Sequence, residues 1–366
     1  MEKSNLDIVK AALERFQISG EIVEIRPFGN GHINDTFRIV SNEQGVGKTA
    51  YVLQTINSLI FRKPAHVMSN IEKVINHLKK KITDPRGTLE IIPTDDGKTF
   101  FMDEFGNFWR MYRFIEDAIC IETLENTEDF YECGVAFGKF QHDLSDFPAE
   151  ELIEVLPDFH NTAKRYENFL KAVKEDKVGR AERVKEEIDF IMQRADFYSL
   201  LAKAHSEGKL PLRVSHNDTK TNNAMLDKAT HKALCVIDLD TIMPGFSVTD
   251  FGDAIRSGAT TAAEDEKDIS KVDFRLDMFS AFAEGFLTGT GGQLENSEIM
   301  LMPEGAKMMT IECGMRFLTD YLEGDTYFKT KYSDHNLVRC RTQLKLVFDM
   351  EQNFDKMKEI VLKFCK

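Results

Sequence analysis

Two short runs of the chain hold the residues best suited to chemistry. The polar run, residues 214–223, reads Val-Ser-His-Asn-Asp-Thr-Lys-Thr-Asn-Asn and places an acid, a base and an amide close together. The apolar run, residues 234–237, leads directly to Asp238 and Asp240. Carboxylate and amide oxygens are the ligands that Mg²⁺ prefers. The two runs therefore predict a polar loop, a short strand after it, and a metal site where that strand ends.

The polar run has the spacing H-x-D-x-x-x-x-N, which resembles the catalytic loop of kinases. Carried over by position, Asp218 is the catalytic base, Asn223 a metal ligand, and Lys220 the lysine that faces the transferred phosphate. Asp238 then matches the aspartate of the metal-binding D-F-G element. Asp218 could instead only cap a helix or order a turn, but the strand and Asp238 that follow at hairpin distance argue against this. His216 is expected to bond the loop backbone.

Two other stretches look like nucleotide motifs but lack the necessary context. Asp250-Phe251-Gly252 spells D-F-G, yet it lies too far beyond Asn223 and follows no apolar strand. We expect it to start a helix, with Asp250 as a structural or capping group. Gly47-Lys48-Thr49 resembles the end of a P-loop, but Asn42 stands where the first glycine is required. This polar, glycine-rich turn is expected to join two strands.

The first 112 residues read as a β-rich part with one helix. Apolar residues alternate in several short segments, whereas residues 65–81 have helical spacing. The predicted strands cover residues 32–40, 49–56, 88–92, 98–103 and 108–115.

The larger remainder of the chain is predicted to be mainly helical. Apolar residues recur at steps of three and four in residues 130–147 and 347–364, which is typical of helices packed in a core. Residues 171–187 are highly charged and predict a solvated helical face. The pattern is that of an α+β protein with a small lobe, residues 1–112, and a larger lobe, residues 113–366. Nucleotide and substrate would meet in a cleft between two such lobes.

Composition excludes several classes of partner. The formal net charge is −14, from 61 acidic and 47 basic residues, so nucleic acid and anionic membranes are not expected to bind. The cysteines are scattered without metal-site spacing, which is typical of free cytosolic thiols. The N-terminus has no apolar signal core, and no apolar run approaches the ~20 residues that span a bilayer. We expect a cytoplasmic protein, either a monomer or a homodimer.

At this point the sequence resembles the aminoglycoside-phosphotransferase and choline-kinase group, and more narrowly the bacterial N-acetylhexosamine 1-kinases. The resemblance implies a bilobal protein-kinase-like fold, the use of ATP and Mg²⁺, and phosphorylation of the anomeric hydroxyl of N-acetylglucosamine or N-acetylgalactosamine. It covers nearly the whole chain. The matching stretches are residues 29–34, 51–54, 216–220, 237–245, 250–253, 312–317 and 321–325.

The resemblance also assigns residues to each ligand. The sugar contacts would be His32, Asp218, Arg316 and Tyr327, although His32 could merely cap a turn and Arg316 could pair with Asp320 one helical turn on. The nucleotide would meet two glycines of a glycine-rich loop, one side chain of the following hairpin, and the backbone of the last strand of the small lobe. These residues are Gly29, Gly31, Gln54, Arg113, Phe114 and Ile115.

The chain departs from the wider kinase pattern in its first part. Gln54 stands where a lysine usually reaches the phosphates, and Glu72 on the next helix would be the partner of that lysine. Asn34 replaces the third glycine of the glycine-rich loop. The N-acetylhexosamine 1-kinases share these features, which leave Mg²⁺ and Lys220 as the candidates for neutralising the α- and β-phosphates.

Other functions stay open. The chain could be a kinase of the same fold for an aminoglycoside, choline, homoserine or another sugar. Choline would call for an aromatic cage, which the single tryptophan, Trp109, does not support. A pseudokinase that binds nucleotide or sugar is favoured only by Gln54. A sulfatase would need a C/S-x-P-x-R motif, which is absent from the sequence.

Overall fold

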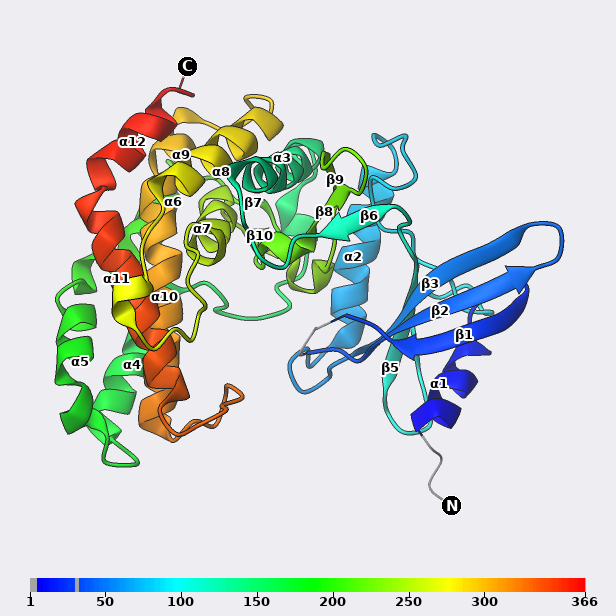
Figure 1. Ribbon diagram of the computed structural model, residues 1–366, viewed down its shortest axis with the longest axis horizontal. Helices are drawn as coiled ribbons and strands as arrows, with labels where there is room; N and C mark the ends of the chain where they lie inside the picture. The colour runs from blue at the N-terminus through cyan, green and yellow to red at the C-terminus, as the bar shows by residue number, and fades with distance from the viewer. Residues whose placement is uncertain (1–4, 30–32, 366) are drawn as a thin grey trace. The chain divides into compact units, whose positions relative to one another are not determined.

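The computed structural model describes residues 5–29 and 33–365. The chain forms two compact units (Figure 1). Unit 1 comprises residues 1–118 together with two later segments, 153–156 and 237–242. Unit 2 comprises residues 119–152, 157–236 and 243–366. The division into a nucleotide-binding lobe, residues 1–112, and a catalytic lobe, residues 113–366, remains a prediction. The two units are defined by compactness alone and say nothing about which ligand each one binds.

Unit 1 is built on an antiparallel five-stranded sheet in the order β1-β2-β3-β5-β4. Its central hairpin joins β2 and β3 through a tight turn in which Gly45 has a φ of 87°, a backbone conformation that favours glycine. Two helices, α1 and α2, accompany the sheet. The elements are α1 (Asn5–Leu13), β1 (Glu21–Pro27), β2 (Thr36–Glu43), β3 (Gly47–Ile56), α2 (Pro64–Leu78), β4 (Phe101–Met102) and β5 (Phe108–Arg113).

The two faces of this sheet differ in character because side chains alternate along each strand. On β5, Trp109 and Met111 pack into an apolar cluster with Phe16 and the buried face of α1. Arg110 points to the opposite face, where its Nη1 lies 4.0 Å from the Sδ of Met68 on α2. A charged side chain is therefore buried between the sheet and α2.

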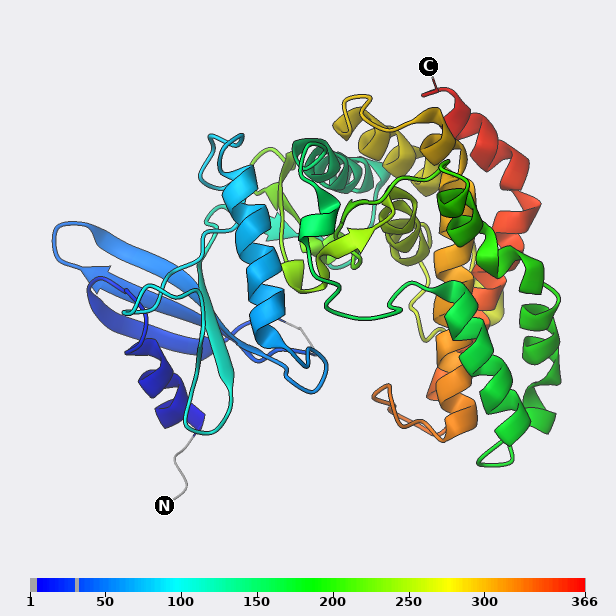
Figure 2. The ribbon, with the colours of Figure 1, turned by 180° about the vertical axis from the view of Figure 1, so that it is seen from behind.

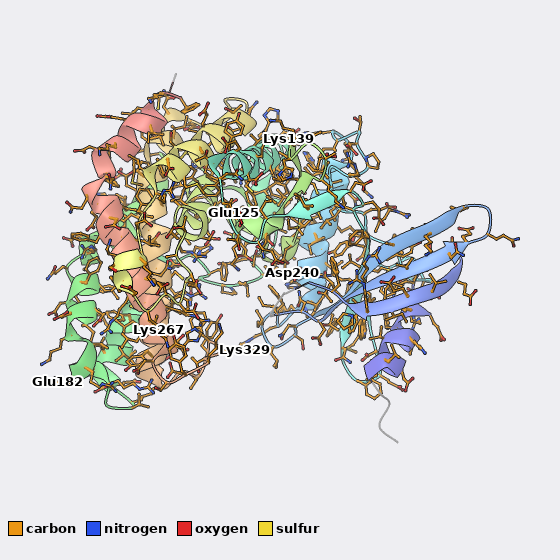
Figure 3. The ribbon with its side chains drawn as sticks, in the orientation of Figure 1. Glu125, Lys139, Glu182, Asp240, Lys267 and Lys329 are labelled. Carbon is orange, nitrogen blue, oxygen red and sulfur yellow. The ribbon has the colours of Figure 1, made fainter. Side chains whose placement is uncertain are left out.

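A buried asparagine on α2 holds the two later segments of unit 1. The Nδ2 of Asn70 donates to the carbonyl oxygens of Ile153 (2.7 Å) and Ile242 (2.9 Å). Its Oδ1 accepts from the Ile153 N–H (2.9 Å). Figure 3 labels Asp240, which belongs to the second of these segments and lies beside α2. Residues far apart in sequence thus meet on one helix.

Unit 2 is mainly helical, with α10 at its centre. In Figures 1 and 2, α4 and α11 run along α10, and α7 also packs on it. Two small sheets, β10-β7 and β6-β8-β9, complete the unit. The elements are β6 (Ala118–Cys120), α3 (Thr127–Asp143), α4 (Thr162–Glu175), α5 (Lys185–Met192), α6 (Leu200–Ser206), β7 (Arg213–Ser215), β8 (Ala224–Asp227), β9 (Ala233–Val236), β10 (Met243–Gly245), α7 (Ser247–Gly258), α8 (Leu276–Gly289), α9 (Asn296–Met300), α10 (Met302–Glu323), α11 (His335–Gln352) and α12 (Phe354–Leu362).

Most of the predicted elements are confirmed. The strands expected at 32–40, 49–56 and 108–115 correspond to β2, β3 and β5, and the helix expected at 65–81 is α2. Most of the apolar stripe of residues 130–147 lies on α3, whose Phe130 and Cys133 are buried, but the helix ends at Asp143, before Leu144 and Phe147. The C-terminal stripe is also buried, but it is divided between α11 and α12 at Asn353.

Three predicted elements need correction. Residues 88–92 form no strand; Arg113 and Ile92 make isolated backbone hydrogen bonds that tie the segment to β5, and Pro93 ends it. The strand expected at 98–103 shrinks to β4. The charged stretch 171–187 is mostly exposed, as predicted, although Ala172, Val184 and Glu187 are buried. It is not one helix, because α4 ends at Glu175 and a turn precedes α5. Figure 3 shows Glu182 at the outer edge of unit 2.

Two predictions from composition can also be checked. All six cysteines are free thiols in this structure. Among residues 5–29 and 33–365, no helix combines the length and the apolar character that crossing a membrane requires.

Candidate active site

The polar loop predicted to be catalytic lies in unit 2 between β7 and β8. β7 pairs antiparallel with β10, so that Ser215 is opposite Met243. Beyond β7 the backbone turns at Asn217, which has a φ of 64° and donates from its Nδ2 to the Ser215 carbonyl (3.0 Å). Asparagine tolerates this left-handed conformation better than most residues. The loop then ends in a short 3₁₀ turn, Thr221–Asn223, that leads into β8.

A buried carboxylate on α7 supports the first half of the loop. Asp250 accepts the N–H of His216 at Oδ2 (2.9 Å) and the N–H of Asn217 at Oδ1 (2.8 Å). Gln141 of α3 donates to the same Oδ2 (2.9 Å) and to the carbonyl of Val214 (3.0 Å). Burial raises the pKa of Asp250 above its ordinary value, and the three N–H donors favour its ionised form. Asp250 is thus structural, as predicted, although it holds another segment rather than capping its own helix.

A second carboxylate, one helical turn further along α7, supports the next part of the loop. Asp253 accepts the N–H of Thr219 at Oδ2 (3.0 Å) and forms an ion pair with Arg256 (2.9 Å). Burial works to raise the pKa of Asp253, but Arg256 and other nearby cations bring it below its ordinary value. We call Gln141, Asp250 and Asp253 the loop floor. Every charge in it has a partner within the protein.

A histidine and a glutamate secure the loop from another direction. The Nε2 of His160 donates to the carbonyl of Asn217 (3.1 Å), and its Nδ1 lies 3.0 Å from Oε1 of Glu312 on α10. Thr162 donates to the other oxygen of Glu312 (2.5 Å). Burial works to lower the pKa of His160, but Glu312 outweighs it and the pKa is raised. Burial works to raise the pKa of Glu312, but His160 leaves it lowered. The pair is therefore favoured as imidazolium and carboxylate.

Asp218 occupies the part of the loop that faces outward. Its side chain is 24% exposed, whereas Asp250 is 2% exposed. The Nζ of Lys220 lies 2.8 Å from its Oδ1. The Nδ2 of Asn223 donates to its main-chain carbonyl (2.9 Å) and to Oδ2 (3.3 Å). The structure thus brings three of the predicted residues, Asp218, Lys220 and Asn223, into one cluster.

The environments of two residues in this loop agree with their predicted roles. Desolvation works to lower the pKa of Lys220, but Asp218 outweighs it, so the pKa is raised and the ammonium form is favoured. His216 is fully buried, and its Nδ1 accepts the N–H of Asp218 (3.2 Å). This confirms that His216 bonds the loop backbone.

The residues predicted to hold Mg²⁺ flank one β-hairpin in sequence. β8 and β9 pair so that Ala224 is opposite Val236. Asn223 immediately precedes Ala224, and Asp238 comes two residues after Val236 with a φ of 60°. Because the amide nitrogen of Asn223 points to Asp218, its amide oxygen is the atom available to a metal. This donor set fits a hard cation. Asp238 belongs to unit 1, and its role remains a prediction.

Unit 1 contains a buried polar network at the predicted phosphate-binding position. Gln54 on β3 lies opposite Arg110 on β5; its Oε1 accepts from the Arg110 Nε (3.2 Å), and its Nε2 donates to Thr36 (3.1 Å). Arg110 also forms an ion pair with Asp240, and both side chains are buried. The Nδ2 of Asn34 donates to the other oxygen of Asp240 (2.7 Å). Gln54 is therefore part of a charge-balanced network, in which Glu72, exposed on α2, takes no part.

The other predicted nucleotide contacts are only partly observable. Gly29 has a φ of 77° with open space around its Cα, whereas Gly31 and His32 lie outside the described residues. The N–H groups of Arg113 and Phe114 donate to the carbonyls of Glu90 (2.9 Å) and Ala50 (3.0 Å). An adenine contact there would use carbonyl groups or the backbone of Ile115. These roles remain predictions.

The predicted sugar-binding residues of α10 and the following loop line one cavity in unit 2. Arg316 and Tyr327 both border a cavity of about 250 Å³. The alternative pairing of Arg316 with Asp320 is not observed among the described residues; Asp320 instead accepts the N–H groups of Thr326, Tyr327 and Phe328. The structure brings Arg316 and Tyr327 to one place, while their contact with a sugar remains a prediction.

Sequence reasoning missed several residues that shape these sites. Asp253, His160 and Glu312 act on the loop from distant positions, and Arg110 and Asp240 meet across 130 positions. Local pattern carries little information about such pairs. Arg110 offered one signal, because a charged residue within the apolar strand Phe-Trp-Arg-Met-Tyr needs a buried partner.

Comparisons with known proteins agree with this arrangement. An aminoglycoside phosphotransferase from Alicyclobacillus acidocaldarius is 10% identical with a TM-score of 0.64, covering 97% of this chain and 96% of that one. An amicoumacin kinase, in complex with AMP-PNP and Ca²⁺, is 14% identical with a TM-score of 0.60, covering 96% and 97%. A choline kinase from Cryptosporidium parvum is 14% identical with a TM-score of 0.58, again covering 96% and 97%. At such identities the likeness concerns the fold.

These likenesses and the chain's own elements establish the protein-kinase-like fold. The family match is independent of them. Residues 24–283 match the family described as "Phosphotransferase enzyme family". This span contains the loop with Asp218, its floor on α7 and the network around Gln54. The chain therefore belongs to the phosphotransferase enzyme family.

Proposed function

We propose that this protein is an ATP-dependent sugar kinase that phosphorylates the anomeric 1-hydroxyl of N-acetylglucosamine or N-acetylgalactosamine. One observation carries the kinase assignment. The Asp218 carboxylate lies between the Lys220 ammonium group and the Asn223 amide on a loop whose backbone is fixed by buried carboxylates. Membership of the phosphotransferase enzyme family supports the reaction class. The sugar is proposed from the resemblance of the sequence to N-acetylhexosamine 1-kinases.

The loop geometry suits direct phosphoryl transfer. The sugar's O1 attacks the γ-phosphorus, the bond from that phosphorus to the β,γ-bridging oxygen breaks, and ADP leaves. Asp218 accepts the proton from O1 as the new bond forms. An anomeric hydroxyl is more acidic than an ordinary alcohol, so a carboxylate of modest basicity is sufficient. Lys220, held beside Asp218, would face the transferred phosphoryl group and balance its charge.

Asn223 and Asp238 would hold the metal ion. The amide of Asn223 is oriented with its nitrogen toward Asp218, which leaves its oxygen for coordination. Mg²⁺ bound there would neutralise charge on the ATP phosphates. The structure of the amicoumacin kinase with AMP-PNP and Ca²⁺ supports the use of a nucleotide and a divalent cation within this fold.

The remaining assignments complete the proposal. The nucleotide would contact Gly29, Gly31 and Gln54 together with the backbone from residue 113 to 115. Gln54 would act as a neutral hydrogen-bonding group, because the nearby positive charge of Arg110 is already balanced by Asp240. The sugar would contact His32, Arg316 and Tyr327 in addition to Asp218.

ADP release from Mg-ATP tests this function directly. The panel comprises N-acetylglucosamine, N-acetylgalactosamine, free hexoses, choline, homoserine and an aminoglycoside, each measured with and without Mg²⁺. We expect the fastest release with an N-acetylhexosamine and formation of its 1-phosphate. Faster release with choline or an aminoglycoside would replace the sugar by that alcohol. Nucleotide binding without ADP release from any acceptor would favour a pseudokinase.

A further inference from the structure

A cavity of about 250 Å³ lies within unit 2, beside α4 and α10. Its third wall is the chain that follows α10, where Tyr327 is 68% exposed. We call it the arginine pocket. Its lining includes Arg165, Arg316, Asp320, Glu323, Tyr327 and Phe328.

Two arginines of this pocket have no carboxylate at ion-pair distance among the described residues. Arg165 donates from Nη2 to the carbonyl of Phe159 (3.0 Å), while its buried Nε has no hydrogen-bond partner. The guanidinium carbon of Arg316 lies 6.0 Å from the ring centre of Phe159 and 5.6 Å from that of Phe328. Within residues 5–29 and 33–365, neither arginine forms an ion pair with a carboxylate. Both guanidinium groups therefore keep hydrogen-bond donors for a ligand.

The carboxylates near the pocket are all engaged elsewhere. Asp320, one helical turn beyond Arg316, accepts three backbone N–H groups and the side-chain amide of Asn336 (2.8 Å). Glu323 lies 3.3 Å from the ammonium group of Lys177. Glu312, one turn before Arg316, is held by His160 and Thr162. Each of these three carboxylates thus has another partner, and none forms an ion pair with either arginine.

An electrostatic cost follows from this arrangement. Burial lowers the pKa of Arg165, and the like charge of Arg316 lowers it further. The charges of Glu312 and Asp158 act in the opposite direction, but neither carboxylate forms an ion pair with Arg165 in the described residues. The two partly buried cations therefore still repel each other, and a bound anion would relieve that repulsion. Guanidinium groups bind carboxylate and phosphate oxygens in paired, charge-assisted hydrogen bonds.

The pocket also connects to the proposed catalytic loop. Glu312 lies one helical turn from Arg316, and it holds His160, which in turn holds the carbonyl of Asn217 next to Asp218. Unit 2 thus contains both the proposed base and the arginines, whereas the proposed nucleotide contacts Gly29 and Gln54 belong to unit 1. The ligand of the arginine pocket is accordingly better assigned to the acceptor than to ATP.

We propose that the arginine pocket binds an oxyanion, a carboxylate or a phosphate, that forms part of the alcohol acceptor. This inference rests on the proposed kinase function and narrows its substrate class: among N-acetylhexosamines, the preferred acceptor is one that bears a negative charge away from the phosphorylated hydroxyl. Arg165 and Arg316 bind the anion, and the ring of Tyr327 lies alongside the sugar.

Matched pairs of sugars test the inference by calorimetric binding in the absence of ATP. Glucuronic acid is compared with glucose, and N-acetylglucosamine 6-phosphate with N-acetylglucosamine. At least one charged sugar should bind about tenfold more tightly than its neutral partner. Arg165→Gln should weaken binding of the charged sugar by ~10–100-fold and that of the neutral one by less than about threefold, whereas Arg316→Gln should weaken binding of the charged sugar by at least as much and also reduce that of the neutral one, because Arg316 is a proposed sugar contact. Arg183→Gln, which removes an exposed arginine outside the pocket, is the matched control and should change neither.

Three results would overturn the inference. They are equal affinity for charged and neutral sugars, failure of both charged sugars to bind, and charged-sugar binding that neither Arg165→Gln nor Arg316→Gln weakens. Inorganic phosphate that binds as tightly as the charged sugars, and depends on Arg165, would assign the pocket to a free anion instead. If Arg165→Gln does not fold, Arg165→Lys keeps the charge but loses the paired donors and should still weaken binding. ADP release with the same sugars separates the two proposals. Release with the neutral sugars alone would overturn the charged acceptor and keep the kinase function, whereas Arg165-dependent binding without ADP release from any sugar would reject the kinase function and leave the pocket as an oxyanion site only.

Discussion

The loop floor and the arginine pocket treat buried charge in opposite ways, although both lie in unit 2. In the floor, Asp250 and Asp253 receive N–H donors from the loop or an arginine at hydrogen-bond distance. In the pocket, Arg165 and Arg316 stand close together while the carboxylates around them serve other groups. Completed charge networks maintain a structure, whereas incomplete ones leave binding capacity. The comparison predicts that substitutions in the loop floor will mainly lower stability, whereas substitutions in the arginine pocket will mainly weaken ligand binding.

Asp218→Asn is expected to have the largest effect on activity. Asp218 rests on the loop floor without belonging to it, so removing its charge should lower kcat by ~10²–10⁴-fold, the usual contribution of a general base. Steady-state ADP release with the best acceptor measures the change. The free energy of unfolding, measured with urea, should change by less than about 1 kcal/mol. A variant with nearly normal turnover would remove Asp218 from the catalytic role.

Asp250→Ala is expected to have the largest effect on stability. The substitution leaves the N–H groups of His216 and Asn217 and the amide of Gln141 without their shared acceptor. Leaving several buried donors unsatisfied should cost ~3 kcal/mol or more, measured by urea denaturation. Asp189→Ala, on the exposed face of α5, is the control and should cost under about 0.5 kcal/mol. Equal losses for the two variants would contradict the proposed support of the loop.

The sequence predicted the fold where periodicity and turn residues are strong. The hairpin of β2 and β3, helix α2 and the long apolar stripes all carry local signals, and the structure confirms them. The prediction from sequence failed where the local pattern is ambiguous. Residues 88–92 alternate like a strand, but they contact β5 through only a few hydrogen bonds before Pro93. The divided helix at residues 171–187 shows that charge indicates exposure without fixing where a helix ends.

The residues of the candidate site were also predictable only where the signal is local in sequence. Asp218, Lys220 and Asn223 lie within six positions, and their spacing alone predicted the cluster that the structure contains. The partners that hold this cluster come from far along the chain, as when His160 meets Glu312. Contacts at such separation depend on how helices pack, which a single sequence does not reveal. The sequence equally cannot reveal that Arg165 lacks an ion-pair partner, because this depends on which groups the neighbouring carboxylates bind in the folded protein.

A smaller effect should appear in the pH dependence of stability. The folded-state pKa of His160 is raised above its ordinary value of 6.5. The stabilisation from its protonation is therefore fully present below that value and is lost as the pH rises through the folded-state pKa. The pKa of Glu312 is lowered, so its contribution is present above its ordinary pKa and is lost only in acid. The difference in unfolding free energy between the wild type and His160→Gln should be larger near pH 6 than near pH 9.

A second histidine provides the control for this pH experiment. The Nδ1 of His205 lies 2.7 Å from the carbonyl of Leu210, and in the described part of the chain no carboxylate lies within ion-pair distance of this ring. His205→Gln therefore removes a histidine ring without removing a carboxylate partner. Two parallel curves for wild type and His160→Gln would mean that the link between α10 and the loop does not depend on an imidazolium ion.

The smallest change in stability is expected for Arg165→Gln, and this prediction divides the two regions most sharply. The substitution removes one hydrogen bond to the Phe159 carbonyl but also relieves repulsion with Arg316, so the free energy of unfolding should change by less than about 1 kcal/mol in either direction. Arg256→Gln makes the same chemical change in a guanidinium group paired with buried Asp253 and should cost ~3–5 kcal/mol. Urea denaturation of both variants, without added anion, gives the comparison. A loss at Arg165 as large as that at Arg256 would make Arg165 a structural residue, whereas a stable variant would show that the fold does not require its charge, as the proposed ligand role needs.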